Sequence, residues 1–409
     1  MDIFLDSKSV LSTEAVWFDN LNIWFSSMLF NGLYKYDIST QKTHFIGSFP
    51  KEKRNEWRLH GKALKIDHEI FFLPNRSKYI HVYDIERHQI YSYDMKTKER
   101  INCKNAIYYK GCIYFVGNDS EITLYEMNAK TKKIKKYPIN IKDYKGQICA
   151  DYIVIDTKFY FACNSENIVI EYNMDSNTYC LHRVFKGGKG FGTIAYDGNS
   201  FLLSDSESVF RWNKDTDIVQ EIYDDFPIGY GMTVKDGDAV VSCTGFTNKY
   251  NRNEKPFWFS AVIADYLWLF PFRTNMIIKM NLSNGKMFEV PLLDEKENDI
   301  SLFMKTRMTH CHYVGGRQGE RILLSSTKTR RMYVLENDGC INTDYFSFLA
   351  EEPKNFEIYY CNDVPIFTES KKENLKKFID IIMSDNRLEG KNYNINSIGN
   401  NIFRFMRSI

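Results

Sequence analysis

Short runs of apolar and β-branched residues, broken by polar turns, fill most of the chain and predict β-strands. One marker recurs among them, an apolar pair with a variable residue and then an Asp or Asn. It occurs as LYKYD (33–37), IHVYD (80–84), LYEMN (124–128), VIEYN (169–173), VFRWN (209–213) and IIKMN (277–281), with MYVLE (332–336) as a looser seventh. Successive markers end 47, 44, 45, 40, 68 and 55 residues apart. A period in the mid-forties is typical of one propeller blade.

A predicted hairpin precedes each of the first six markers. The hairpins are AVWF-DNL-NIWFS, ALKI-DH-EIFFL, AIYY-KG-CIYFV, YIVI-DTK-FYFAC, TIAY-DGN-SFLLS and AVIA-D-YLWLF. Tight Asp-Gly and Lys-Gly turns between β-rich runs favour hairpins. A polar turn such as ISTQKT and a short apolar run such as HFIGSF follow the markers. Each repeat therefore predicts four antiparallel strands.

Four-stranded repeats of this length predict an all-β fold, a β-propeller whose blades stand radially and protect their edges. Seven repeats indicate seven blades, and a count of six or eight stays open. The open part is 228–258, where MTVKDGDAVVSC predicts one more hairpin but the following TGFTNKYNRNEKP supplies no obvious outer strands. This stretch is either a decorated loop or an eighth, degenerate blade.

The repeats resemble those of YVTN, NHL and streptogramin-lyase propellers, in which an apolar strand like IWF leads through a short loop to an apolar-x-x-Asp strand. The resemblance covers residues 14–347 and is one of pattern, and the Trp-Asp dipeptide of WD40 blades is absent. The lyase resemblance implies a magnesium-dependent reaction. Those lyases place His and Glu residues in the central funnel, and that set has no residue-by-residue match in this chain.

The period changes after residue 350. An apolar stripe with helical spacing and a capping box at its start predict one helix. Its residues are Leu375, Phe378, Ile379, Ile382 and Met383, behind Ser370 and Glu373. A second helix is predicted from Ser397 to the end of the sequence. The chain therefore divides into a propeller, 1–350, and a C-terminal helical extension, 351–409, which we expect to pack on the propeller; a surface for a partner is the alternative.

Composition and charge narrow the classes of partner. Aromatic residues make up 15% of the chain, with only 9 Pro, which indicates a globular protein. Lys plus Arg (54) nearly balance Asp plus Glu (52), so neither nucleic acid nor a membrane is expected as a partner. The most apolar stretch, 257–272, is too short to span a bilayer and contains Asp265. Nine cysteines without a C-x-x-C pair, and an acidic N-terminus without an apolar signal segment, predict a cytoplasmic protein.

Two similar stretches, FFLPNRSKYI (71–80) and WLFPFRTNMI (268–277), supply the main candidate site. Both place P-x-R-[ST] in the loop between the second and third strands of a blade, so Arg76 and Arg273 emerge at the same end of the propeller. Ser77 and Thr274 follow them. Guanidinium groups bind carboxylates or phosphates through paired hydrogen bonds. The two arginines therefore predict a site for an anionic ligand, and a purely structural role for the Arg and Pro residues is the alternative.

Other residues are predicted at the same end. Trp57 and Arg58 lie in one connection between blades, and Lys189 lies in the Gly-rich connection GGKGFG (187–192). Consecutive glycines let backbone N–H groups approach an anion, although an ordinary flexible loop is the simpler interpretation. The sequence THCH (309–312) offers only two imidazoles, and zinc needs three or four ligands. No metal and no cofactor are therefore predicted.

The leading functional hypothesis is a non-catalytic propeller that recognises an anionic small molecule, glycan or peptide through the loops between second and third strands. One alternative is a propeller lyase or hydrolase with a metal-assisted site in the central funnel. Another is a protein–protein interaction scaffold. No catalytic motif occurs, but propeller enzymes assemble sites from several loops, so catalysis stays open.

Overall fold

The computed structural model describes residues 13–290 and 313–347, apart from gaps at 247–254 and 327–330 and shorter gaps of one to three residues, together with 358–361 and 364–367. The chain forms two compact units, Met1–Ala350 and Glu351–Ile409. No helix among the described residues is long and apolar enough to cross a bilayer.

Within the first unit the described strands form seven antiparallel sheets of four strands each, and in every one the strand order follows the sequence. The first three sheets contain β1 (Thr13–Phe18), β2 (Asn22–Ser27), β3 (Leu33–Asp37), β4 (Lys42–Gly47); β5 (His60–Ile66), β6 (Glu69–Pro74), β7 (Tyr79–Asp84), β8 (Gln89–Asp94); and β9 (Cys103–Tyr109), β10 (Cys112–Asn118), β11 (Ile122–Asn128), β12 (Ile134–Ile139). The predicted hairpins of these sheets are confirmed.

The other four sheets repeat the pattern. They contain β13 (Ile153–Ile155), β14 (Lys158–Ala162), β15 (Ile168–Asn173), β16 (Thr178–Arg183); β17 (Thr193–Tyr196), β18 (Phe201–Ser204), β19 (Val209–Asn213), β20 (Ile218–Ile222); β24 (Phe257–Ile263), β25 (Tyr266–Pro271), β26 (Ile277–Asn281), β27 (Met287–Val290); and β28 (Tyr313–Gln318), β29 (Arg321–Ser326), β30 (Arg331–Leu335), β31 (Ile341–Ser347). The looser seventh marker ends on β30, so it also marks a third strand.

The Asp or Asn of the marker has a specific hydrogen-bonding role. Asn128, at the end of β11, accepts hydrogen bonds from the backbone N–H groups of Lys130 and Thr131 at 3.2 and 2.7 Å. The fourth residue of this turn, Lys132, has a left-handed backbone with φ of 59°. The same cap and a left-handed residue at the same position recur at Asp84, Asn173, Asn213 and Asn281. Such caps favour a turn over continued strand, so the marker defines where each third strand ends.

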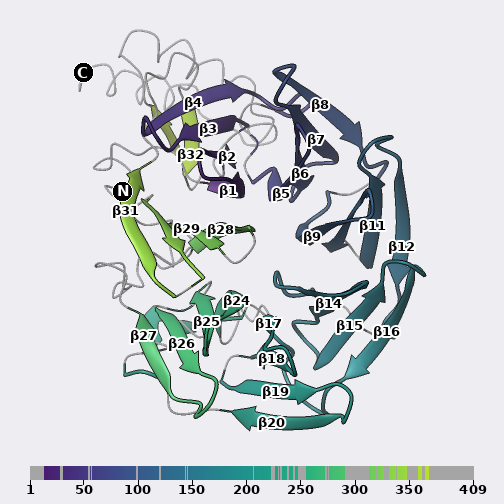
Figure 1. Ribbon diagram of the computed structural model, residues 1–409, viewed down its shortest axis with the longest axis vertical. Helices are drawn as coiled ribbons and strands as arrows, with labels where there is room; N and C mark the ends of the chain where they lie inside the picture. The colour runs from purple at the N-terminus through teal and green to yellow at the C-terminus, as the bar shows by residue number, and fades with distance from the viewer. Residues whose placement is uncertain are drawn as a thin grey trace, which may run out of the picture. The chain divides into compact units, whose positions relative to one another are not determined.

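The sheets stand side by side around a ring within the first unit (Figure 1). Their innermost strands are the first strands of each sheet: β5 lies against β1 and β9, β17 against β13 and β24, and β28 against β1. The last contact closes the ring. It is reinforced by Arg321, whose Nη1 donates to Asn20 Oδ1 at 2.7 Å and whose guanidinium lies 5.7 Å from the centre of the Phe18 ring.

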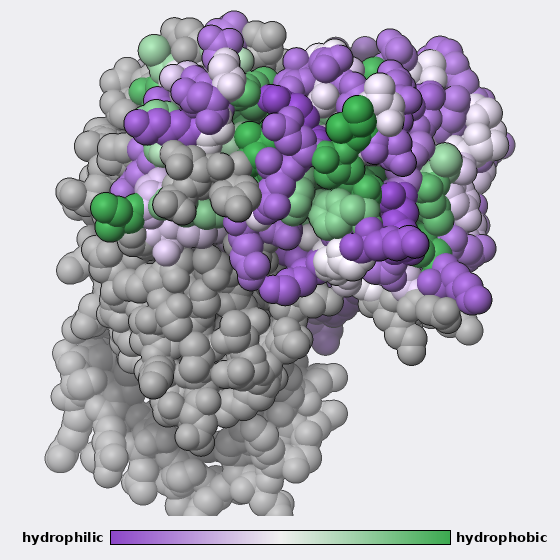
Figure 2. All heavy atoms as spheres, turned by 90° about the horizontal axis from the view of Figure 1, so that it is seen from below, coloured by the Kyte–Doolittle hydropathy of each residue, from purple (hydrophilic) through white to green (hydrophobic). Residues whose placement is uncertain are grey.

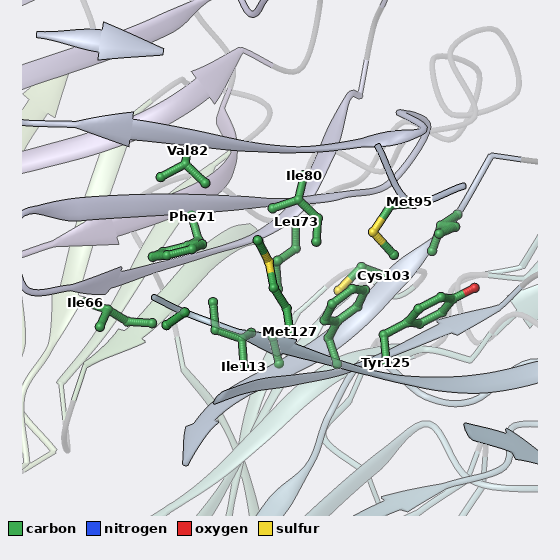
Figure 3. Packing of buried hydrophobic residues seen from close by; sticks show 14 residues of the cluster. Ile66, Phe71, Leu73, Ile80, Val82, Met95, Cys103, Ile113, Tyr125 and Met127 are labelled. Atoms are coloured by element: carbon green, nitrogen blue, oxygen red, sulfur yellow. The ribbon is translucent and has the colours of Figure 1, made fainter. Parts of the chain in front are cut away.

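Apolar clusters fill the space between neighbouring sheets. In one of them Phe71 and Val82 of the second sheet pack toward Ile113 and Met127 of the third (Figure 3). Comparable clusters join the first sheet to the second, the third to the fourth, and so on to the last. Burying both sides of each sheet in this way explains why the second and third strands are nearly continuous apolar runs.

The uncertain stretch 228–258 contains the predicted hairpin, as β21 (Thr233–Asp236) and β22 (Ala239–Ser242), with a short third strand, β23 (Gly245–Phe246). This small sheet does not separate its neighbours in the ring. The innermost strands β17 and β24 lie directly against each other, and their two sheets share one apolar cluster. The described part of this stretch therefore does not come between those two sheets along the innermost strands.

The described part of the second unit is a hairpin of β32 (Ile358–Cys361) and β33 (Val364–Phe367), which the sequence analysis did not predict. Both predicted helices, and with them the stripe from Leu375 to Met383, lie outside the described residues. Their packing on the propeller stays a prediction.

The repeated cap gives a direct test of the fold. Asn128→Ala removes the acceptor for two backbone N–H groups, so the free energy of unfolding is expected to fall by about 1 kcal/mol. Asn128→Asp is the matched control, because its carboxylate keeps the acceptor and lies among lysines. Chemical denaturation measures both. Equal losses in the two variants would contradict the assigned role of the cap.

Candidate functional site

The two ends of the ring differ in how their backbone groups are bonded. At one end, here called the turn end, the turn after each third strand bonds to the hairpin turn of the same sheet. The N–H of Ile85 donates to the His68 carbonyl at 2.9 Å, and the same bond recurs in four other sheets. At the other, here called the loop end, the loops between second and third strands meet the connections between sheets. These loops vary in length and sequence, so the loop end is where specific recognition has room to evolve.

Arg76 and Ser77 lie in such a loop, after Pro74 closes β6. The backbone N–H groups of Asn75, Arg76 and Ser77 all point at the carbonyl of Leu59, at 2.8, 3.3 and 3.4 Å. The loop is thus wrapped around the residue that precedes β5. This bonding explains why β6 ends at Pro74 and why a turn-forming segment follows it. The half-buried Arg76 lies at the loop end.

The two hydroxyl residues of the repeated motif are buried. Ser77 donates from Oγ to Glu52 Oε1 at 2.5 Å and accepts the N–H of Tyr79 at 2.8 Å. Burial raises the pKa of the Glu52 carboxyl, and the hydrogen bond from Ser77 opposes that rise. Thr274 has no exposed surface either. Both hydroxyls therefore belong to the framework of their loops.

Some predicted residues lie outside the described part of the chain: Arg273, Trp57 and the THCH segment. Whether Arg76 and Arg273 share a ligand thus stays a prediction. Arg58 is described and half-buried, with a left-handed backbone at φ of 54°. It stands one residue before Leu59, so Arg58 and Arg76 belong to the same corner of the second sheet.

The Gly-rich connection is held by one side chain. Asn167, in the loop before β15, donates from Nδ2 to the Gly187 carbonyl at 2.8 Å and accepts the N–H of Gly190 at 3.0 Å. The backbone that would cradle an anion is therefore already bonded. Lys189 projects to an exposed contact with Glu207 at 3.0 Å, and its carbonyl accepts a hydrogen bond from Lys255.

The sequence analysis missed a cluster of polar groups on and next to the innermost strands near the loop end. We call it the axial cluster. It consists of the side chains of Lys62, Cys103, Asp151 and Ser260 and the backbone N–H of Ile194. Oδ2 of the buried Asp151 accepts the N–H of Ile194 at 3.2 Å and both the N–H and the hydroxyl of Ser260, at 2.8 and 2.6 Å. One carboxylate thereby joins β17 and β24 to the segment that leads into β13.

Lys62, on β5, is the cation of the axial cluster. Its side chain is only half-buried, yet burial lowers the pKa of its ammonium group, and the nearby Cys103 and Asp151 only partly counter this. Leu64 and Ile66, which share a face of β5 with Lys62, pack between the second and third sheets, so Lys62 lies on the side of β5 that faces β9. Among the described residues no group of three or more His, Cys, Asp or Glu side chains is placed to hold a metal ion.

Two buried imidazoles form a second missed feature. His60 Nε2 lies 2.8 Å from His81 Nδ1, and His81 Nε2 lies 3.1 Å from the Pro50 carbonyl, which can only accept. His81 must therefore carry its proton on Nε2 and accept from His60 through Nδ1. Burial lowers the pKa of His81 to about 4 and holds that of His60 well below its usual range, so both are neutral.

Comparisons with known proteins identify the fold and go no further. No family model matches the sequence, and no curated protein matches it. Solved structures do match. The structure of U3-55K has a TM-score of 0.50 at 11% identity, covering 77% of this chain and 88% of that one. A chain of the mitotic checkpoint complex has a TM-score of 0.50 at 7% identity, covering 79% and 88%. The WD40 repeats of RRP9 have a TM-score of 0.49 at 11% identity, covering 77% and 87%.

The repeated four-stranded sheets, arranged around a ring, define the chain as an all-β propeller, and the two neighbours with a TM-score of 0.50 share this fold. The sequence predicted the propeller class correctly. The finer resemblance to YVTN, NHL and streptogramin-lyase propellers is not confirmed by these neighbours. At such low identity the likeness concerns the fold alone.

The imidazole pair makes stability depend on pH. Both folded pKa values lie below the unfolded value of about 6.5, so the unfolded chain binds more protons and stability is lost as the pH falls below about 6.5. Between pH 6.5 and 4.5 the loss is expected to be on the order of 2 kcal/mol for each imidazole and about 4 kcal/mol for the pair. In the His60→Gln, His81→Gln double variant this part of the pH dependence should disappear. His44→Gln, at an exposed position on β4, should leave the wild-type profile unchanged.

The bridging role of Asp151 is tested by removing its charge. Asp151→Asn weakens an acceptor shared by three donors on two other sheets, so the free energy of unfolding should fall by about 2 kcal/mol. Asp156→Asn makes the same chemical change at an exposed hairpin turn and should cost less than about 0.5 kcal/mol. Denaturant titrations compare the two, and an Asp151→Asn protein as stable as wild type would contradict the bridge.

Proposed function

We propose that this chain is a protein-interaction scaffold, a propeller without chemistry of its own that binds a protein partner at its loop end. The observation that carries the proposal is the difference between the two ends. Repeated caps fix the turn end, whereas the loop end combines unrelated loops, several exposed lysines and the axial cluster. One structural neighbour is a chain of a complex, which supports an assembly role for this fold.

The outer side of the ring offers less to a partner. Viewed from below Figure 1, the described surface is mostly hydrophilic and its apolar patches are small (Figure 2). The outermost strand β12 carries Lys135 and Lys136, which discourage pairing of the sheet edge with another chain. This agrees with the interpretation of the basic run KTKKIKK as edge protection. We further propose a cytoplasmic location, since Cys112, Cys149, Cys163 and Cys180 are free thiols.

Charge reversal at the two ends separates the proposal from its alternatives. Lys78 and Lys189 are exposed at the loop end, and Lys130 and Lys133 are exposed at the turn end. The tagged wild type and the two double Lys→Glu variants, which change the net charge equally, are used to capture partners from an extract of the cells that make the protein. Proteins enriched by the wild type should fall at least about fivefold with the loop-end variant, because reversed rim charges repel a matched partner.

The turn-end variant should retain these proteins. Equal capture by all three proteins, or loss with the turn-end variant alone, would contradict the proposal. Quantitative mass spectrometry of the captured proteins gives the comparison, and thermal unfolding confirms that the variants fold.

A further inference from the structure

Lys62 carries a charge that no described residue pairs directly. Among the described residues nothing forms a hydrogen bond or ion pair with its ammonium group. Burial nevertheless lowers its pKa, which means that the positive charge is held at a cost to folding. Groups of this kind are often retained for binding, because an incoming ion of opposite charge removes the cost.

The nearest acid, Asp151, counters the charge of Lys62 only in part. Asp151 Oδ2 accepts three hydrogen bonds from Ile194 and Ser260, and Oδ1 accepts the N–H of Tyr152 at 3.1 Å. These bonds hold the carboxylate on β17 and β24, so it forms no ion pair with Lys62. An anion from a partner would add to this partial compensation.

The strand that carries Lys62 lies close to its neighbour in the ring. A Cβ atom at Gly61 would stand 2.3 Å from the Cys103 carbonyl oxygen, so β5 and β9 approach each other as closely as a glycine allows. Across the ring, a Cβ atom at Gly192 would stand 2.7 Å from Cβ of Lys255. The innermost strands thus begin close together at the loop end.

The loops above Lys62 are predominantly basic. Among their described residues, the connection into β5 and the loop after β6 carry five cations: Lys51, Lys53, Arg58, Arg76 and Lys78. Two acids oppose them, and both are engaged. Glu52 accepts a hydrogen bond from the Ser77 hydroxyl. Glu56 accepts hydrogen bonds from both terminal nitrogens of Arg100, at 3.3 and 2.9 Å. This corner of the loop end therefore favours a negatively charged partner.

We propose that the loop end recognises an acidic peptide segment of the partner, with one carboxylate placed against Lys62 and further acidic residues over the basic loops of the second sheet. This inference rests on the proposed function and names the chemistry of the partner. Neighbouring acidic residues then gain from the exposed Lys53 and Lys78 in these loops.

The test uses fluorescently labelled, capped hexaglutamate as the probe and capped hexaglutamine as its neutral counterpart. Fluorescence anisotropy at low salt measures their binding to the full chain. Hexaglutamate should bind saturably and hexaglutamine should not. Lys62→Met keeps the length of the side chain and removes its charge, and it should weaken hexaglutamate binding at least about tenfold. Lys65→Met is the control, because Lys65 lies on the same strand but is exposed and contacts the Trp17 ring.

A second readout does not depend on any variant. The rate of acetylation of Lys62 as a function of pH, followed by mass spectrometry, gives its pKa in the wild type. This pKa should rise toward the ordinary lysine value when hexaglutamate is bound. Lys62→Met should also be at least as stable to heat as the wild type, since it removes an uncompensated charge.

Equal binding of hexaglutamate by wild type and Lys62→Met would overturn the inference, and so would a Lys62 pKa that does not respond to the peptide. Complete displacement of the peptide by an equal concentration of inorganic phosphate would also overturn it, because it would indicate a site for a small anion only. A captured partner that is lost with the loop-end charge reversal but retained by Lys62→Met would end this inference and leave the proposed function standing. If capture of the partner is unaffected by the loop-end charge reversal and by Lys62→Met, the inference and the proposed function are both contradicted.

Discussion

The structure depends on a side-chain oxygen that caps two backbone N–H groups where the third strand ends in five of the seven sheets. At Asn173 the cap spans only the next three residues, and the following Asn177 turns the chain with a left-handed backbone at φ of 54°. Because the interaction is local, each repeat can form its turn before any contact with other sheets exists. The outermost strand is thereby returned antiparallel to the third. Repetition of this one corner keeps the sheets alike enough to pack around a ring.

The ring has to be closed and held by contacts of a different kind. Arg321 joins the last sheet to the first through Asn20, and Asp151 joins the fourth, fifth and sixth four-stranded sheets along the axis. Both link residues far apart in sequence. Lys62 on β5 lies near Asp151, which counters its charge only in part. Lys62 is the charged group on which recognition is proposed to act.

These two kinds of contact explain what the sequence could and could not predict. The caps and hairpins were predictable because their signals, such as Asn281 or the Lys110-Gly111 turn, lie within a few residues of what they control. The axial cluster was not, since Asp151 and Ser260 are 109 residues apart. One signal for the axial cluster was available in the sequence. When the repeats are aligned on their hairpin turns, a polar residue recurs four residues before the end of the first strand, at Lys62, Asn105 and Asp151. The motif shared by Ser77 and Thr274 was visible in the sequence, but both hydroxyl residues are buried in the framework of their loops.

The most direct test of the account is to find which end of the ring a bound partner touches. Exposed lysines lie at both ends, with Lys51 and Lys189 at the loop end and Lys110 and Lys286 at the turn end, so amine-reactive cross-linking of a captured complex samples both ends. Mass spectrometry then locates the links. The account predicts links from the loop-end lysines to partner lysines that flank acidic segments. Links confined to the turn-end lysines would contradict it.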